Sequence, residues 1–143
     1  MRPEAELAVE WLRKGDDDLA ASRLMLTASE PIPWIAAFHA EQAAEKFLKA
    51  FLTFHRVEFA RTHDIGYLLG LCVELAPQLA ALSDAAPDLT DFAVEARYPF
   101  PRKDPPLDEA RRALQIARDL AEAVREQLPD EICRFPDGRS KLP

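Results

Sequence analysis

The chain has 143 residues, which is enough for one domain whose hydrophobic core needs neither disulfides nor a structural metal. Its 25 acidic and 18 basic residues give a formal net charge of −7, which argues against tight nonspecific binding to DNA or RNA but is compatible with a local basic pocket. There are only 4 glycines, and the stretches between prolines are rich in Ala, Leu, Glu and Arg without sustained apolar–polar alternation. We therefore predict an all-α domain, an up-and-down antiparallel bundle of four main helices with short connecting helices.

The cysteines and apolar runs indicate a cellular compartment. Cys72 lies in an apolar run and Cys133 lies near the C-terminus, with no CxxC pair, as in a reduced intracellular protein. The N-terminus leads directly into acidic helical sequence, and no apolar run approaches the roughly 20 residues that span a bilayer. We expect a cytoplasmic protein with no membrane partner.

The first predicted helix runs from about Glu4 to Ala28. Apolar residues repeat along it every seven positions and can form a seam against a partner helix: Ala5, Leu12, Leu19 and Leu26. Gly15, in a neighbouring row of small residues, indicates either a close helix crossing or a local bend. The three aspartates of residues 16–18 point about 100° apart on a helix and cannot converge on one ion, so we expect a solvated acidic turn.

The second predicted helix begins at Pro33 or Trp34, after the break at residues 31–33, and ends at Phe54 or His55. Its apolar residues spread over about half of the circumference, so it must be covered on several sides. Polar residues recur at spacings of three and four and form one narrow stripe: His39, Gln42, Lys46 and Lys49. This stripe is either the solvated edge of a central bundle helix or, with His63 and residues 97–99, the wall of a cleft for a phosphate-bearing ligand.

The rest of the chain predicts shorter elements and one more long helix. A third helix begins at residues 62–64, where Thr62 or Asp64 can cap the first turn. Its expected buried face is Ile65, Leu68, Leu69, Cys72 and Leu75. Pro77 ends this helix or begins a short one through Leu82. A loop follows over 83–88, then a short helix over 89–96 and a proline-rich loop over 99–106. The last long helix is predicted over 107–128. We expect a domain over 1–129 and a loose tail over 130–143.

The sequence lacks the usual signatures of hydrolases and metal sites. It has no HExxH, no Walker glycine loop, no GxSxG and no Cys/His ligand set, so we expect no metal and no cofactor. The three histidines are His39, His55 and His63. They are too scattered to indicate a metal, although His39 and His63 would meet if the second and third helices pack side by side.

Three motifs together resemble a known family. The run over 36–50, AAFHAEQAAEKFLKA, is followed by Thr-His-Asp at 62–64, then Ala-Arg-Tyr-Pro at 96–99 and a terminal amphipathic helix. This order resembles the HEPN domain (higher eukaryotes and prokaryotes nucleotide-binding) over roughly residues 5 to 128. The resemblance implies an up-and-down helical bundle that commonly dimerises. It also implies a minimal nucleotidyltransferase as partner, often as a toxin–antitoxin pair.

Many HEPN proteins are metal-independent ribonucleases. Their active site pairs an Arg with a His four to six residues away, near the start of a late helix, and is doubled across the dimer. Here Arg97 and Arg102 lie in that region, but no histidine follows His63. Arg56 and His63 have six residues between them, yet they lie before the third helix, where the family has its Thr-His-Asp motif. The Arg-x4-6-His motif is therefore not found at its expected place.

We accordingly expect a nucleotide-binding or partner-binding HEPN protein, and not an enzyme. One alternative is a metal-independent endoribonuclease toxin, with His63 as general acid or base and Arg97 stabilising the transition state. A second alternative is an assembly module whose only activity is dimerisation. The residues predicted to bind the ligand are His39, Lys46, Lys49, His63, Arg97 and Tyr98.

Physical chemistry gives each predicted ligand residue a role and an alternative. Lys46 and Lys49 can neutralise phosphate as point charges, and Arg97 can grip it through a planar fork, while Tyr98 offers a ring on which a base can stack. Arg97 could instead form a salt bridge to an acidic residue such as Glu45. His63 could instead be a buried residue at a helix start, hydrogen-bonded to backbone.

A homodimer is expected from apolar surface as well as from the resemblance. The second helix is apolar over too much of its circumference for one neighbour, and Tyr98, Phe100 and Pro101 add aromatic and proline surface. We predict a two-fold dimer that packs around the connection after Arg97 and brings two basic clefts near one groove.

Overall fold

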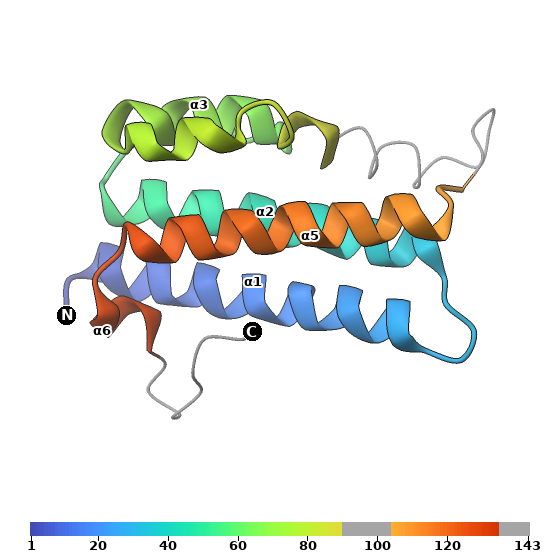
Figure 1. The fold of residues 1–143 in the computed structure, drawn as a ribbon. Helices are drawn as coiled ribbons and strands as arrows, with labels where there is room; N and C mark the ends of the chain where they lie inside the picture. Colours follow the sequence, from blue (N-terminus) through green and yellow to red (C-terminus); the bar gives the residue numbers. More distant parts are fainter. Residues whose placement is uncertain (90–103, 135–143) are drawn as a thin grey trace.

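Figure 1 shows the computed structural model, which describes residues 1–89 and 104–134. The main helices are α1 (Pro3–Thr27), α2 (Pro33–Phe54), α3 (Ile65–Leu75) and α5 (Leu107–Glu126). A 3-10 helix, η1 (Pro77–Leu82), follows α3, and a short helix, α6 (Asp130–Cys133), follows α5. The described part of the chain contains no strand. The predicted all-α bundle of four main helices with short connecting ones is confirmed.

Local sequence signals place the helix ends within a few residues of the predicted positions. Pro3 and Pro33 are first residues of α1 and α2, where proline's fixed φ fits the helix and its missing N–H costs no hydrogen bond. Asp64 caps α3 because its side chain accepts a hydrogen bond from the backbone N–H of Tyr67 at 3.1 Å.

α2 is the central helix of the bundle. It packs against α1, α3 and α5, as Figure 1 shows. Phe47, Leu48 and Phe51 on α2 are at most 1% exposed. The expectation that this helix needs cover on several sides is confirmed. The chain itself supplies that cover, so the apolar circumference of α2 no longer argues for a dimer.

Gly15 marks a close crossing of α1 and α2, and not a bend. α1 continues as a helix through Gly15, which is buried. A Cβ added there would lie 3.0 Å from Cζ of Phe47, tighter than ordinary packing contacts. The glycine therefore lets the α1 backbone approach the Phe47 ring.

The aspartates of residues 16–18 do not form the expected solvated turn. Asp16 is 1% exposed and Asp18 is 9% exposed, whereas Asp17 faces solvent. Asp16 accepts a hydrogen bond from a guanidinium N–H of Arg125 on α5 at 2.5 Å. The three side chains do diverge as helical geometry requires, but two of them meet cations from neighbouring helices.

Two smaller expectations also need correction. Leu75 was expected on the buried face of α3 but is 51% exposed, because it lies at the end of the helix. The tail was expected to be loose from residue 130, but residues 130–133 form α6 and bury Ile132 and Cys133. The short helix predicted over 89–96, most of the following proline-rich loop and the rest of the tail lie outside the described residues, except that residue 89 is helical.

Both cysteines are free and buried, consistent with their separation in the sequence. Burial raises the pKa of the Cys72 thiol to about 12, so it stays protonated at neutral pH. Within residues 1–89 and 104–134, no helix has the length and hydropathy needed to cross a membrane.

Replacing Gly15 by Ala tests the close crossing. The new methyl would gain about 1 kcal/mol of helix propensity but crowd the buried Phe47 ring, and overpacking costs about 1–3 kcal/mol. We expect a net loss of unfolding free energy in urea titrations. The matched control is Gly70→Ala in α3, where the added methyl meets nothing within 4 Å and should stabilise by about 1 kcal/mol. A Gly15→Ala protein as stable as the wild type would contradict the crossing.

Candidate functional site

The polar residues of α2 form a wider sector than the four-residue stripe seen in the sequence. At 100° per residue the sector spans roughly 160° of the helix. We call it the α2 polar sector: His39, Glu41, Gln42, Glu45, Lys46 and Lys49. Glu41 and Glu45 extend the stripe toward α3, and both are nearly fully buried. The sequence analysis missed these two acids as part of the site, although their i,i+4 spacing beside the stripe was a usable signal.

On the side of α1, the sector is held by one carboxylate. Asp18 accepts hydrogen bonds from the Lys46 ammonium and from the ring of His39, whose Nδ1 lies 2.9 Å from Oδ1. The side chains of His39 and Lys46 are 32% and 21% exposed. The predicted solvated edge is thus an ion-paired contact between α1 and α2 that is open on one side.

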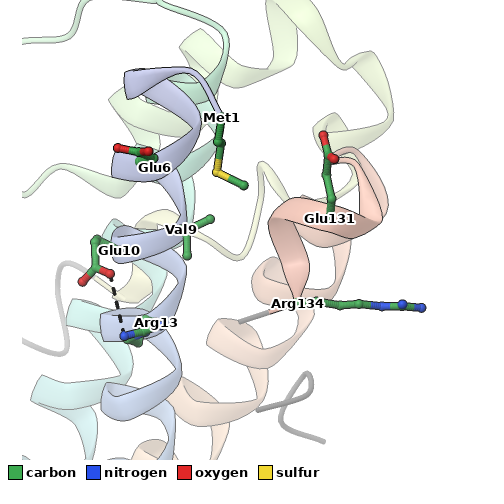
Figure 2. A pocket seen from close by; sticks show the side chains of 7 residues that line it. All are labelled: Met1, Glu6, Val9, Glu10, Arg13, Glu131 and Arg134. Atoms are coloured by element: carbon green, nitrogen blue, oxygen red, sulfur yellow. Dashed lines mark ion pairs between the residues drawn. The ribbon is translucent and has the colours of Figure 1, made fainter. Parts of the chain in front are cut away.

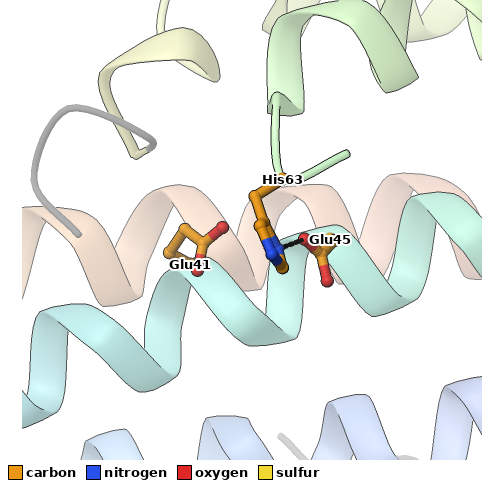
Figure 3. A group of neighbouring side chains, drawn as sticks. All are labelled: Glu41, Glu45 and His63. Atoms are coloured by element: carbon orange, nitrogen blue, oxygen red, sulfur yellow. Dashed lines mark hydrogen bonds and ion pairs between the residues drawn. The ribbon is translucent and has the colours of Figure 1, made fainter. Parts of the chain in front are cut away.

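On the side of α3, a second carboxylate holds the sector. Figure 3 shows His63, on the connection to α3, pointing down to Glu45 on α2. The Nδ1 atom of His63 lies 2.5 Å from Oε1 of Glu45, and Nζ of Lys49 lies 3.4 Å from Oε2. The Lys49 ammonium also stands 5.6 Å and 5.8 Å from the ring centroids of Trp11 and Phe59.

The surroundings of His63 contradict the alternative of a buried residue, and its ligand binding stays a prediction. Its side chain is 62% exposed and contacts a carboxylate, so the prediction of a buried histidine is wrong. The reason is that residue 63 precedes the first turn of α3, on a connection that passes over α2. Its partner Glu45 is only 5% exposed, so the imidazole is an exposed group anchored to a buried one.

The structure divides the predicted ligand residues into two groups. His39 and Lys46 share Asp18, whereas His63 and Lys49 share Glu45. His39 thus belongs to the α2 polar sector and His63 lies against it, and the two histidines bind different carboxylates. The remaining predicted residues, Arg97 and Tyr98, lie outside the described residues, as does any salt bridge from Arg97 to Glu45.

Three potential metal ligands come together here. The ligand atoms of Glu41, Glu45 and His63 all lie within 4.8 Å of one another. However, the Glu41 carboxylate accepts a hydrogen bond from Gln42 at 2.9 Å, and Glu45 already faces the Lys49 ammonium. A divalent cation would have to compete with that ammonium. We therefore interpret the three groups as a hydrogen-bonded cluster that orients His63.

Two grooves on the described surface lie apart from the polar sector. The first, with a volume of about 360 Å³, lies between α1 and α6, and Figure 2 shows that its side chains carry both charges. Inside it Arg13 lies 3.8 Å from Glu10. The second, of about 310 Å³, lies between α1 and α5 and is rich in arginine. Neither groove contains a residue that the sequence predicted to bind a ligand.

Comparison with known proteins identifies a domain type. A family model described as the HEPN domain matches residues 8–127. No curated protein and no solved structure matched the chain. The matched range includes the whole α2 polar sector, His63 and all of α5.

Asp16 and Asp18 allow a comparison between a buried and a partly exposed ion-pair acceptor in one helix. Asp16→Ala leaves the 4% exposed Arg125 without its carboxylate, which should cost about 3–5 kcal/mol of unfolding free energy. Asp18→Ala leaves Lys46 and His39, which water can reach, and should cost about 1 kcal/mol. Urea unfolding of both variants measures the difference. Equal losses would contradict the assignment of Asp16–Arg125 as the structural pair.

Proposed function

The chain belongs to the HEPN domain family, and on this premise we propose that it binds the phosphate of a nucleotide or of RNA without cleaving it. Membership supports a role related to nucleotides or RNA in general. The observation that supports the site is the exposed imidazole of His63 anchored on the buried Glu45 carboxylate. The hydrogen bond to Nδ1 fixes the orientation of the ring, as carboxylate partners of functional histidines commonly do.

Charge balance shows what else this site needs. Glu41 and Glu45 place two carboxylates beside the single ammonium of Lys49, so Lys49 has little charge left for a ligand. A phosphate at His63 therefore requires a further cation. Arg97 is the residue that we propose for this role, because it belongs to the third motif and can grip phosphate through its planar fork. Tyr98 would then be placed to stack on a base.

His39 and Lys46 have a secondary part in this proposal. Their shared partner Asp18 carries one negative charge, so the group is neutral when His39 is neutral and positive when it is protonated. Both side chains are partly exposed, and they lie on the same face of α2 as Lys49. They would attract a phosphate-bearing ligand without forming its main contact.

Calorimetry with ATP, ADP and a short single-stranded RNA tests this function. Wild-type protein should bind at least one of them. His63→Ala and Arg97→Ala should each weaken binding at least tenfold, because each removes a direct phosphate contact. His55→Ala is the matched control, since that ring packs on Phe51 and Phe54 at the far end of α2. Full affinity in both test variants would contradict the site, and no binding of any probe would contradict the function.

A ribonuclease is the second candidate, and the same histidine favours it. An imidazole held by a carboxylate is a common arrangement for general acid–base catalysis, and Arg97 would stabilise the charge of a phosphorane-like transition state. This candidate departs from the family's late-helix Arg-x4-6-His pattern, because no histidine follows residue 63.

Incubation of the purified protein with structured and single-stranded RNA in EDTA separates the two candidates. If the protein is a nuclease through His63, His63→Ala should abolish cleavage and Glu45→Gln should reduce it, because the ring loses its charged anchor. Equal cleavage by wild type and His63→Ala would remove His63 from the mechanism. No cleavage by the wild type would leave binding as the function.

Partners complete the proposal. The family context supports a homodimer and a minimal nucleotidyltransferase, together forming a toxin–antitoxin module. We place the dimer contact at Tyr98, Phe100 and Pro101, which lie outside the described residues. Exposed large apolar side chains elsewhere are separated from one another, with Leu7 and Leu24 near opposite ends of α1 and Leu75 at the end of α3. An assembly module without ligand binding would use the same contact.

A further inference from the structure

The arginine-rich groove lies between the C-terminal part of α1 and the N-terminal half of α5. Arg23 comes from α1, and Arg111 and Arg118 come from α5. Leu26 and Leu114 give it an apolar lining between the guanidinium groups. We propose that this groove is a second anion site, which binds a ligand carrying more than one phosphate, and that it is separate from His63.

The first argument is uncompensated charge. The side chains of Arg23 and Arg118 form no ion pair or hydrogen bond with another residue of the described ranges, in a chain whose net charge is −7. Arg111 lies 3.4 Å from Asp108, but that carboxylate is 94% exposed, so water screens the pair. Among the described residues no acid lines the groove, and Asp119, next to Arg118 in the chain, accepts a hydrogen bond from Gln115 at 2.9 Å. The groove therefore concentrates positive charge on an acidic protein.

The second argument is shape. Arginines along one face of an amphipathic helix usually form a solvated surface, and α5 alone would be explained that way. Here Arg23 arrives from a different helix and closes a concavity of about 310 Å³, near the lower end of the size range of small-ligand sites. Guanidinium groups from two helices lie around one concavity, and their mutual repulsion, although screened by water, is relieved when an anion binds between them. The packing of α1 against α5 does not by itself require arginines from both helices around one groove.

Spacing indicates the class of anion. Arg111 and Arg118 are seven residues apart, which places their Cα atoms about 10 Å apart along α5 and on the same face. Guanidinium groups distributed over this length fit charges that are also distributed, as in a nucleoside diphosphate or a run of phosphodiesters. A single phosphate would engage one end of the groove. The shared chemistry is thus two or more linked phosphates.

This inference takes only its class of ligand from the proposed function. The location of the groove is independent of that function, because the groove residues lie on α1 and α5 whereas His63 contacts α2. The test measures fluorescence anisotropy of a labelled single-stranded RNA, with ADP and AMP as competitors. Arg23→Gln combined with Arg118→Gln should weaken RNA binding at least tenfold. It should also flatten the dependence of log K on log salt by about 1.4, since each lost contact to a single strand contributes about 0.7.

The control removes the same charge from neighbouring positions outside the groove. Arg112→Gln combined with Lys14→Gln changes exposed residues of the same two helices, with Arg112 facing Asp88 at 4.0 Å. This variant should bind within twofold of the wild type. An equal loss of RNA affinity in both double variants would mean that binding depends only on net charge. That result would contradict the groove as a binding site.

The competitors and the His63 variant separate the remaining outcomes. ADP should displace the labelled RNA more strongly than AMP. If only unlabelled RNA displaces it, the groove binds phosphodiesters. Equal competition by AMP and ADP would contradict the proposal that the ligand needs two or more linked phosphates. Loss of binding in His63→Ala with full binding in Arg23→Gln/Arg118→Gln would overturn the groove and keep the proposed site. Full binding in His63→Ala with loss of binding in Arg23→Gln/Arg118→Gln would support the groove and exclude His63 from the site. No binding of any probe would contradict both the groove and the proposed function.

Discussion

The ion pair between Asp16 and Arg125 holds the three long helices in one arrangement. Its two side chains are 1% and 4% exposed, and it joins residues 109 positions apart in the chain. The guanidinium group also lies 5.0 Å from the ring centroid of Phe47 on α2, so α1, α2 and α5 meet at this point. Removing two charges from water costs several kcal/mol per ion, and only close geometry offsets that cost. The register of the three helices is therefore tightly constrained around the pair.

The same constraint explains how the polar residues of α2 are used. Phe47 can lie under Arg125 because Gly15 lets α1 approach its ring. With α1 and α2 that close, His39 and Lys46 on α2 reach the buried Asp18 on α1. Glu45 binds Lys49 within α2 and also His63 on the connection to α3. Most charges of α2 are thus used to hold neighbouring elements in place. The two places that we propose for ligands therefore lie at the edges of the bundle, at His63 and in the groove between α1 and α5.

This distribution gives a physical account of how an acidic HEPN domain can have a role related to nucleotides or RNA. A net charge of −7 opposes diffuse attraction of a polyanion, so recognition has to come from a few positioned cations. In our proposal the anchored imidazole of His63 supplies one contact to the ligand, because a buried carboxylate fixes its ring. The guanidinium groups at Arg23 and Arg118 differ, because no described residue neutralises them. Each arrangement places a donor at the surface and supports it from the bundle.

The helices, their ends and the family could be predicted from the sequence, because these depend on local signals. Periodic apolar residues define α1, α2 and α5, and Pro3 and Pro33 place two helix starts. Gly15 on a row of small residues indicated either a close crossing or a bend, and the structure shows the crossing. Only the tertiary structure decided which charges are buried and with which partners. Helical spacing shows that Asp16 and Asp18 point in different directions, but not that Arg125 or Lys46 lies there, nor that the connection before α3 sets His63 on Glu45. Those pairings depend on how helices that are far apart in the sequence pack together, and a local sequence pattern does not determine that packing.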